Sequence, residues 1–227
     1  MTDRTARRRL LIFIVAYNAE RTVAGVLQRI PEDLVERYDV EVLVIDDASA
    51  DLTFESASEA RLRNTLPFRL RLFKNPVNQG YGGNQKIGYW YALDNDFDYV
   101  ALVHGDGQYA PEYLPELLRP LERDEADAVF GSRMLMSGEA RAGGMPLYKY
   151  AGNKVLTRFQ NRMLGTAFSE FHSGYRIYAV SALRKIPFEL NTNDFHFDTE
   201  IILQLLIAEQ RIKEVPIPTY YGDEISH

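Results

Sequence analysis

Residues 40–53 read VEVLVIDDASADLT and join an apolar run to a polar turn and the start of a helix. Val40–Ile45 is rich in valine and isoleucine, which favour strands, so it predicts a buried strand. Ser49 and Asp51 are residue types that cap helices, and a helix is expected over Asp51–Arg63. A buried strand that leads through a short polar turn into a helix is the repeating unit of an α/β sheet.

The same unit recurs through the first half of the chain. Strands are predicted at Leu10–Ala16, Val40–Ile45, Arg69–Phe73, Tyr99–Val103 and Ala128–Phe130. Helices are predicted at Glu20–Ile30, Asp51–Arg63, Asn84–Leu93 and Pro111–Glu122. Runs that are apolar throughout are typical of parallel strands buried on both faces. The alternation therefore predicts right-handed crossovers and one α/β domain with a mostly parallel central sheet.

The second half of the chain is less regular. Its predicted elements are a helix at Tyr148–Leu164, a strand at Gly174–Val180, a helix at Asp198–Glu209 and a strand at Ile212–Ile217. The glycine-rich segment Ser137–Pro146 predicts a mobile loop. No repeat or low-complexity linker divides the chain, so we expect a flexible basic tail over residues 1–9 and a single domain over residues 10–227.

Composition narrows the function classes. The 227 residues include no cysteine and carry a formal net charge of −6. Without cysteine there are no disulfides, thiolate metal sites or cysteine nucleophile, and the acidic balance argues against nucleic-acid binding. No apolar run approaches the roughly 20 residues that a membrane-spanning helix needs, and we expect a cytoplasmic protein. Arg4, Arg7, Arg8 and Arg9 predict a solvated tail, with contact to an anionic membrane surface as the alternative.

Acidic side chains gather where the predicted strands end. Ligands of open parallel sheets bind beyond the carboxyl ends of the strands, and Asp46, Asp47 and Asp106 all follow strands directly. Asp46 and Asp47 are adjacent, so their side chains point to opposite sides of the strand. One can accept a hydrogen bond from a base or ribose while the other holds the loop. Simple capping of the next helix is the alternative for this segment.

Asp106 and Gln108 form a candidate cation site on a turn with Gly105 and Gly107. Mg²⁺ and Mn²⁺ prefer carboxylate and carbonyl oxygens, and a bound diphosphate and water can complete the coordination. His104 could add a nitrogen ligand, which suits Mn²⁺ better than Mg²⁺. An ordinary Gly-Asp-Gly turn remains the alternative.

The Gly80–Gly83 run resembles a phosphate-binding loop only in part. It has no P-loop lysine, although Lys86 is close in the sequence. The glycines can let the backbone approach either a ligand or another loop.

Taken in order, these segments resemble family 2 glycosyltransferases, which have the GT-A fold. The most specific match is Asp46–Thr53, which is similar to the nucleoside-binding Asp-Asp-x-Ser-x-Asp-x-Thr segment of that family. Ala16-Tyr17-Asn18, Asn78–Asn84 and Gly131-Ser132-Arg133 match further motifs. The resemblance implies that the nucleotide sugar is bound by Ala16, Tyr17, Asn18, Glu20, Asp46, Asp47, Ser49, Gly80, Lys86, Gly105 and Arg133.

The chain is most similar to the polyprenyl-phosphate sugar synthase branch of the family, which includes dolichol-phosphate mannosyltransferase. That branch holds metal and diphosphate with an Asp-x-Asp-x-Gln-x-x-Pro-Glu segment, and this chain reads HGDGQYAPE from His104 to Glu112. His104 thus replaces the first acid of the motif. Ser173–Arg176 is similar to a Ser-Gly-Phe-Arg segment, whereas the late Arg-x-x-Gly-x-Ser-Lys motif of the branch is not matched.

The resemblance implies inverting transfer of a sugar from a UDP- or GDP-sugar, with a polyprenyl phosphate as a candidate acceptor. A cation at Asp106, with Arg133 or Arg176, would neutralise the leaving diphosphate. Asp198 and Glu200 are candidate general bases for a hydroxyl acceptor, and their i, i+2 spacing on a helix allows only one to face the site. A phosphate acceptor needs no base and would use positive charge, for which Arg141, Lys149 and Lys154 are candidates.

Two other functional classes are alternatives to a glycosyltransferase. A nucleotide-sugar-binding module without activity is suggested by His104 in place of an acid. A dinucleotide-dependent oxidoreductase would need a glycine-rich turn after the first strand, and residues 16–20 contain no glycine.

A polyprenyl phosphate acceptor would place the protein at the inner face of a membrane. The sequence does not indicate an oligomeric state.

Overall fold

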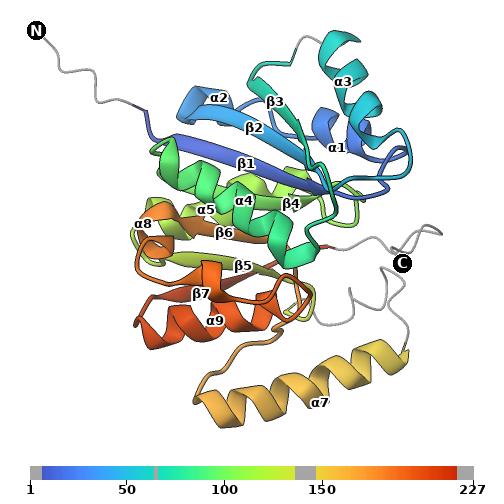
Figure 1. Cartoon of the computed structure of the whole chain (residues 1–227). Helices are drawn as coiled ribbons and strands as arrows, with labels where there is room; N and C mark the ends of the chain where they lie inside the picture. The colour runs from blue at the N-terminus through green and yellow to red at the C-terminus, as the bar shows by residue number, and fades with distance from the viewer. Residues whose placement is uncertain (1–6, 64–65, 136–146, 219–227) are drawn as a thin grey trace, which may run out of the picture.

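The computed structural model describes residues 7–63, 66–135 and 147–218. Its centre is a seven-stranded sheet in the order β3-β2-β1-β4-β6-β5-β7 (Figure 1). The strands are β1 Arg9–Ala16, β2 Asp39–Asp46, β3 Arg69–Lys74, β4 Tyr99–His104, β5 Ala128–Ser132, β6 Arg176–Ala179 and β7 Ile212–Pro216. Only β6 runs antiparallel to its neighbours, β4 and β5, so the predicted mostly parallel sheet is confirmed.

Helices cover both faces of the sheet, and in Figure 1 α4 crosses in front of it. The helices are α1 Val23–Gln28, α2 Leu34–Arg37, α3 Thr53–Arg63, α4 Tyr81–Asp94, α5 Leu114–Glu122, α7 Leu147–Leu164, α8 Val180–Leu183 and α9 Phe197–Ile207, with 3₁₀ turns η1 Pro111–Tyr113 and η2 Phe188–Leu190. Alternate residues of β1 enter two different cores, Leu10 and Ile12 on one face and Leu11 and Phe13 on the other. This two-sided burial is why the strand is apolar throughout.

The register brings the ends of the central strands level with one another. Ala16 of β1 pairs with Asp46 of β2, and Val15 pairs with His104 of β4. The loops that follow β1, β2 and β4 therefore leave the sheet side by side. This edge, which we call the carboxyl rim, is where the sequence places the candidate ligand-binding residues.

Several predicted elements have different bounds in the structure. The helix predicted at Glu20–Ile30 is shorter, and the one predicted at Asn84–Leu93 begins three residues earlier, at Tyr81. The segment Pro111–Glu122 opens with a 3₁₀ turn, and the predicted strand at Gly174–Val180 is reduced to four residues. The short helices α2 and α8 were not predicted.

The predicted flexible tail extends less far than residue 9. Arg9 is the first residue of β1, and its backbone N–H donates to Asp98. The side chain of Arg7 donates to the carbonyl of Val35 (2.7 Å), and Arg8 donates to the hydroxyl of Tyr99. These bonds hold residues 7–9 against the domain.

The predicted mobile loop Ser137–Pro146 lies outside the described residues. Among the described residues no helix is long and apolar enough to cross a bilayer.

Candidate functional site

Two loops of the carboxyl rim are joined by hydrogen bonds. The backbone N–H of Asn18 donates to Ser49 Oγ (2.9 Å), and Asn18 Oδ1 accepts from the N–H of Ala50 (3.1 Å). Glu20 makes a reciprocal pair of bonds, donating to Asp51 (3.1 Å) and accepting from Leu52 (3.2 Å). Asn18, Glu20 and Ser49 therefore position the two loops relative to each other. Ala16 is buried beneath them, and Tyr17 is exposed on the surface of the rim.

Asp46 and Asp47 have different surroundings although they are neighbours in sequence. Asp47 accepts from the side chain of Asn75 (2.7 Å) and from the backbone N–H groups of Gln79 (2.8 Å) and Gly80 (3.1 Å), so it holds the loop after β3. Asp46 accepts from the backbone N–H of Ser49 (3.0 Å) through Oδ1. Its Oδ2 lies 3.3 Å from Lys74 Nζ without hydrogen-bond geometry. Of the two carboxylates, Asp46 has the oxygen that is less fully engaged.

The glycine run forms the start of α4 and contacts another loop of the chain. The N–H groups of Gly82 and Gly83 both donate to the carbonyl of Asn193 (2.9 and 3.3 Å). Gly80 has φ +82°, and a Cβ there would lie 2.4 Å from the same carbonyl oxygen. Lys86 donates to the carbonyl of Asn191 and to Asn193 Oδ1 (2.8 Å). The amides and the lysine that the sequence suggested for a phosphate are thus bonded to residues 191–193.

Asp106 lies on a turn at the end of β4. Its Oδ1 accepts from the N–H of Gln108 (2.9 Å), and Gly107 has φ +73°. The carbonyl of Gly105 accepts from the hydroxyl of Thr22 (2.7 Å), which ties this turn to α1. The Asp106 side chain is partly exposed, and its Oδ2 makes no hydrogen bond within residues 7–63, 66–135 and 147–218. Oδ2 is therefore available to a ligand.

The His104 ring turns toward aromatic residues. Its Nε2 lies 3.4 Å from the Tyr81 hydroxyl, and the ring makes edge contacts with those of Tyr81 and Tyr109. A Cβ at Gly174 would lie 2.5 Å from Nε2, so the ring is closely packed on that side. Burial lowers the pKa of His104, against the opposing influence of Asp106 and Asp198. The geometry gives no support to His104 as a metal ligand through Nε2.

Arg176 is buried, although the sequence suggested it as a contact for the leaving diphosphate. Its Nε donates to the carbonyl of Ser173 (2.8 Å), and its terminal nitrogens donate to the carbonyls of Phe171 (3.0 Å) and Asp198 (2.9 Å). The guanidinium lies over the ring of Phe130. Burial acts to lower its pKa, but the Asp198 carboxylate raises it on balance, so Arg176 stays charged. This position favours a structural role beneath the site over direct contact with a phosphate.

The two candidate general bases on α9 face different partners. Asp198 accepts from the Tyr81 hydroxyl (2.9 Å) through Oδ2, and its Oδ1 lies 3.4 Å from the Arg176 guanidinium. Burial and then Asp198 raise the pKa of Tyr81, so its phenol remains a donor. Glu200 accepts from the backbone N–H (2.7 Å) and the hydroxyl (3.0 Å) of Thr192. Asp198 thus belongs to the cluster around His104, whereas Glu200 holds the loop before α9.

A buried ion pair that the sequence did not predict lies beside the end of β5. Glu170 accepts from Arg133 through the backbone N–H (3.1 Å), Nε (3.2 Å) and Nη2. It also accepts from Asn153 of α7 (2.9 Å). Arg133 further donates to the carbonyl of His172 (3.2 Å). Arg133 therefore reaches the rim as a paired residue, and no motif in the sequence marked Glu170 as its partner.

A divalent cation fits this site only if a bound diphosphate supplies some of the coordinating oxygens. Among the described residues no group of three or more His, Cys, Asp or Glu side chains is placed to hold a metal ion. Asp106 supplies one accessible carboxylate oxygen, and Gln108 lies next to it on the turn. A hard cation accepts one protein carboxylate when diphosphate oxygens and water fill its other positions. The donor set is consistent with a cation that binds together with a nucleoside diphosphate.

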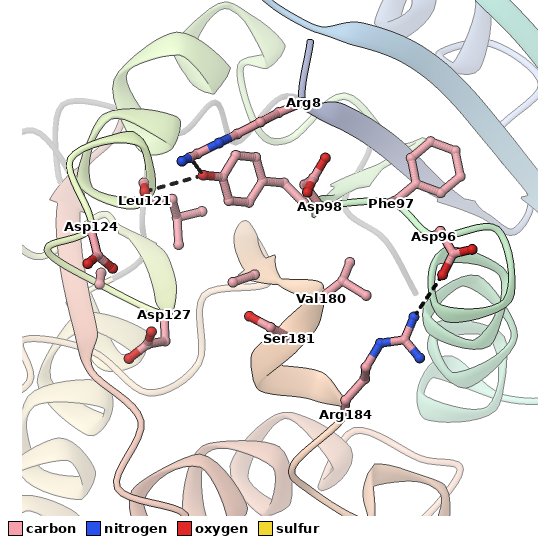
Figure 2. Close-up of a pocket in the computed structure, with 13 residues that line it drawn as sticks. Arg8, Asp96, Phe97, Asp98, Leu121, Asp124, Asp127, Val180, Ser181 and Arg184 are labelled. Atoms are coloured by element: carbon pink, nitrogen blue, oxygen red, sulfur yellow. Dashed lines mark hydrogen bonds and ion pairs between the residues drawn. The ribbon is translucent and has the colours of Figure 1, made fainter. Parts of the chain in front are cut away.

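A cavity of about 600 Å³ lies elsewhere on the molecule (Figure 2). It is lined by residues at the start of β4 and β5 and at the end of the antiparallel β6, among them Tyr99, Asp127 and Ala179. In Figure 2 Arg184 reaches toward Asp96. Arg8 donates to the hydroxyl of Tyr99. This cavity is at the edge of the sheet opposite the carboxyl rim, so it is separate from the candidate site.

Comparison with known proteins places the chain among sugar-transferring enzymes. The family described as glycosyl transferase family 2 matches residues 11–187. The chain is 30% identical over 95% of its length to the low-salt glycan biosynthesis hexosyltransferase Agl6 of Haloferax volcanii, and spans 48% of that protein. It is 27% identical over 92% of its length to the undecaprenyl-phosphate mannosyltransferase of Micrococcus luteus, and covers 82% of that protein.

The fold is also found among solved structures. Glucosyl-3-phosphoglycerate synthase from Mycobacterium tuberculosis, crystallised with Mn²⁺, UDP and phosphoglyceric acid, superposes with a TM-score of 0.68. That likeness covers 96% of this chain and 72% of the synthase, at 17% sequence identity. The likeness establishes the GT-A fold, which was expected from the sequence.

Proposed function

The chain belongs to glycosyl transferase family 2, and on that premise we propose that it transfers a sugar from a UDP- or GDP-sugar to a polyprenyl phosphate with inversion. The observation that carries the proposal is the convergence of three loops at level strand ends. The Asn18 and Ser49 loops are bonded to each other, and the Asp106 turn lies beside them through the β1–β4 register. A nucleotide and its diphosphate are the ligand that such a rim accommodates.

In this proposal Asp46 and Asp106 have different tasks. Asp46 Oδ2 accepts a hydrogen bond from the base or ribose once Lys74, which is partly exposed, turns away from it. Asp106 and Gln108 hold Mg²⁺ or Mn²⁺ together with the diphosphate. The cation supplies charge neutralisation to the leaving group, because Arg133 is paired with Glu170 and Arg176 is bonded to backbone carbonyls.

The state of the two α9 acids supports a phosphate acceptor. Both oxygens of Asp198 lie close to donors, and Glu200 is bonded to Thr192. A general base must accept a proton from the attacking group, and both oxygens of Asp198 and Oε2 of Glu200 already lie within reach of protein donors. A phosphate acceptor is already anionic and needs no base. The relative from Micrococcus luteus is named for an acceptor of this kind.

The proposed reaction is one displacement at the anomeric carbon. An acceptor phosphate oxygen forms the new bond to that carbon from the face opposite the diphosphate. The bond between the carbon and the diphosphate oxygen breaks, and its electron pair leaves with the nucleoside diphosphate. The role of the protein is to hold donor and acceptor in line and to stabilise the departing charge.

An inactive nucleotide-sugar-binding module is not favoured. The argument for it was His104, which replaces an acid of the family motif. The structure places the His104 ring against Tyr81 and Tyr109, while Asp106 keeps an oxygen at the rim that accepts no hydrogen bond from the described residues. His104 differs from the family motif, but the proposed cation site depends on Asp106.

A transfer assay tests the proposal. Purified protein is incubated with Mn²⁺, a polyprenyl phosphate, and radiolabelled UDP-glucose, UDP-N-acetylglucosamine or GDP-mannose in turn, and label in the lipid extract is counted. We expect one donor to label the lipid, and Asp106→Asn to lower the rate at least about 100-fold. Asp94→Asn, an exposed acid on α4, serves as the control and should keep the rate. No labelled lipid with any donor, or an unchanged rate in Asp106→Asn, would contradict the proposal.

A further inference from the structure

The helix α7 has its apolar side chains on the outside. Tyr148, Val155, Leu156, Phe159 and Met163 are between 45% and 73% exposed. At about 100° per residue these positions share one stripe along the helix. In Figure 1 α7 lies outside the helices that cover the sheet. An exposed apolar stripe of this length is unusual on a protein that has no partner.

The side of α7 that faces the domain is mostly polar, although Leu164 at the end of the helix packs against the core. Thr157 is buried, and its hydroxyl donates to Asn153 Oδ1 (3.0 Å). Asn153 in turn donates to Glu170 (2.9 Å), and Asn161 donates to the carbonyl of Phe168 (2.7 Å). The helix is thus reversed relative to an ordinary surface helix, which buries its apolar face against the core. Its apolar face is free to contact something outside the domain.

The charge of α7 indicates what that partner is. Its 18 residues include Lys149, Lys154, Arg158 and Arg162 and no acid, in a chain with a net charge of −6. Lys154, Arg158 and Arg162 are exposed and follow at four-residue spacing, so they form a row along one edge of the apolar stripe. Within the described part of the chain none of these three forms an ion pair with an acidic side chain. A second α7 packed on this face would bring like charges together, which disfavours a symmetric dimer through it.

We propose that α7 docks in the plane of an anionic membrane surface. A helix with an apolar stripe and a flanking row of lysine and arginine inserts its apolar side chains at the boundary between headgroups and acyl chains. The cations meet the negative headgroups. This inference does not depend on the proposed transfer reaction, because it rests on the faces and charges of α7 alone.

Docking through α7 would also orient the site. The bond from Asn153 to Glu170 connects the helix to the Arg133–Glu170 ion pair at the end of β5. The carboxyl rim is therefore held next to the docked helix by a short chain of contacts. A membrane-bound acceptor would reach the rim without leaving the bilayer surface.

Vesicle sedimentation of the full chain tests the docking. Vesicles of phosphatidylcholine with about one quarter phosphatidylglycerol are compared with phosphatidylcholine alone, at about 0.1 M salt. We expect the protein to sediment with the anionic vesicles and to stay in solution with the neutral ones. Replacing Lys154, Arg158 and Arg162 with alanine should lower the partition coefficient about 100-fold, or about fivefold per cation. The triple variant Leu156→Ser, Phe159→Ser, Met163→Ser should lower it at least about tenfold.

The control variants replace residues elsewhere that are at least as exposed as those of α7. Leu62, Leu190 and Ile207 are 79–83% exposed, and their replacement with serine should leave sedimentation unchanged. Alanine at Arg61, Arg63 and Arg123 controls for the loss of three positive charges. Circular dichroism melting of each variant checks that the fold is kept. The proposal would be overturned if the wild type did not bind anionic vesicles, or if both α7 variants bound them fully. It would also be overturned if the wild type formed a dimer that the apolar variant dissociated.

Discussion

Replacing Glu170 with glutamine is expected to lower the free energy of unfolding by about 3–5 kcal/mol. The Glu170 side chain has no exposed surface, and that of its partner Arg133 is only 10% exposed. Glutamine keeps the size of the side chain but puts an NH₂ group where a carboxylate accepted from the guanidinium. The variant therefore removes the carboxylate that pairs with this buried guanidinium, and it weakens the contact with Asn153 of α7.

An exposed pair in the same protein provides the control. Arg29 donates to Glu112 through Nε (2.8 Å) and Nη2 (2.9 Å), so this pair is also bidentate. Its side chains are 35% and 47% exposed, and water screens their attraction. Glu112→Gln is therefore expected to cost no more than about 1 kcal/mol. The difference between the two variants measures the combined effect of burial and of the additional hydrogen bonds that Glu170 accepts.

Urea denaturation followed by circular dichroism measures both variants. The comparison requires that each variant keeps the wild-type dependence of unfolding free energy on urea concentration. A change in that slope would indicate a change in the denatured state. If Glu170→Gln costs no more than Glu112→Gln, the buried pair does not hold the end of β5 as the geometry implies. The role assigned to Glu170 would then be refuted.

Two further predictions concern backbone conformation and pH. Gly80→Ala should cost at least about 1–3 kcal/mol in a urea titration, because φ is +82° and the Cβ would meet the Asn193 carbonyl. Gly25→Ala in α1 has open space and should instead stabilise the protein by about 0.5–1 kcal/mol; the reverse order would contradict the structure. Hydrogen bonds from Arg211 lower the pKa of Asp127 in the folded protein. Asp127 therefore stabilises the folded state at pH values above its unfolded pKa of about 4, and this stabilisation is lost as the pH falls through the lower pKa of the folded state. Asp127→Asn should therefore cost about 0.5–1 kcal/mol near neutral pH and less in acid, and a cost that is constant with pH would be evidence against the assignment.

Much of the fold was predictable because both faces of the sheet are buried. β1, β2 and β4 are apolar runs that end in polar turns, and that pattern predicts parallel strands with a ligand-binding edge. The direction of β6 was not predictable. Its residues pair with β4 and β5, which lie far away in the sequence, and a run of four residues carries no signal of orientation. The start of α4 was missed because glycine disfavours helices, whereas here the Asn193 carbonyl accepts from the first amides.

The part of the candidate site that was predictable consists of aspartates directly after buried strands, because such carboxylates either bind a ligand or hold a loop. Asp46, Asp47 and Asp106 lie on the rim as the sequence indicated, and Asp47 is the member that holds a loop. Arg176 could not be assigned from sequence, because an arginine two residues after a glycine is equally compatible with burial against backbone carbonyls. Glu170 was missed for a similar reason. A single acid between a serine and a phenylalanine does not reveal that a distant arginine will be buried with it.

The central claim is that the carboxyl rim binds a nucleoside diphosphate together with a cation at Asp106. Isothermal titration of UDP and of GDP into the wild type, Asp106→Asn and Asp94→Asn, each with and without Mn²⁺, tests it most directly. Mn²⁺ should strengthen the binding of one nucleotide at least about tenfold in the wild type and in Asp94→Asn, and should have no such effect in Asp106→Asn. If neither nucleotide binds, or if Asp106→Asn keeps the full effect of Mn²⁺, the account of this site is contradicted.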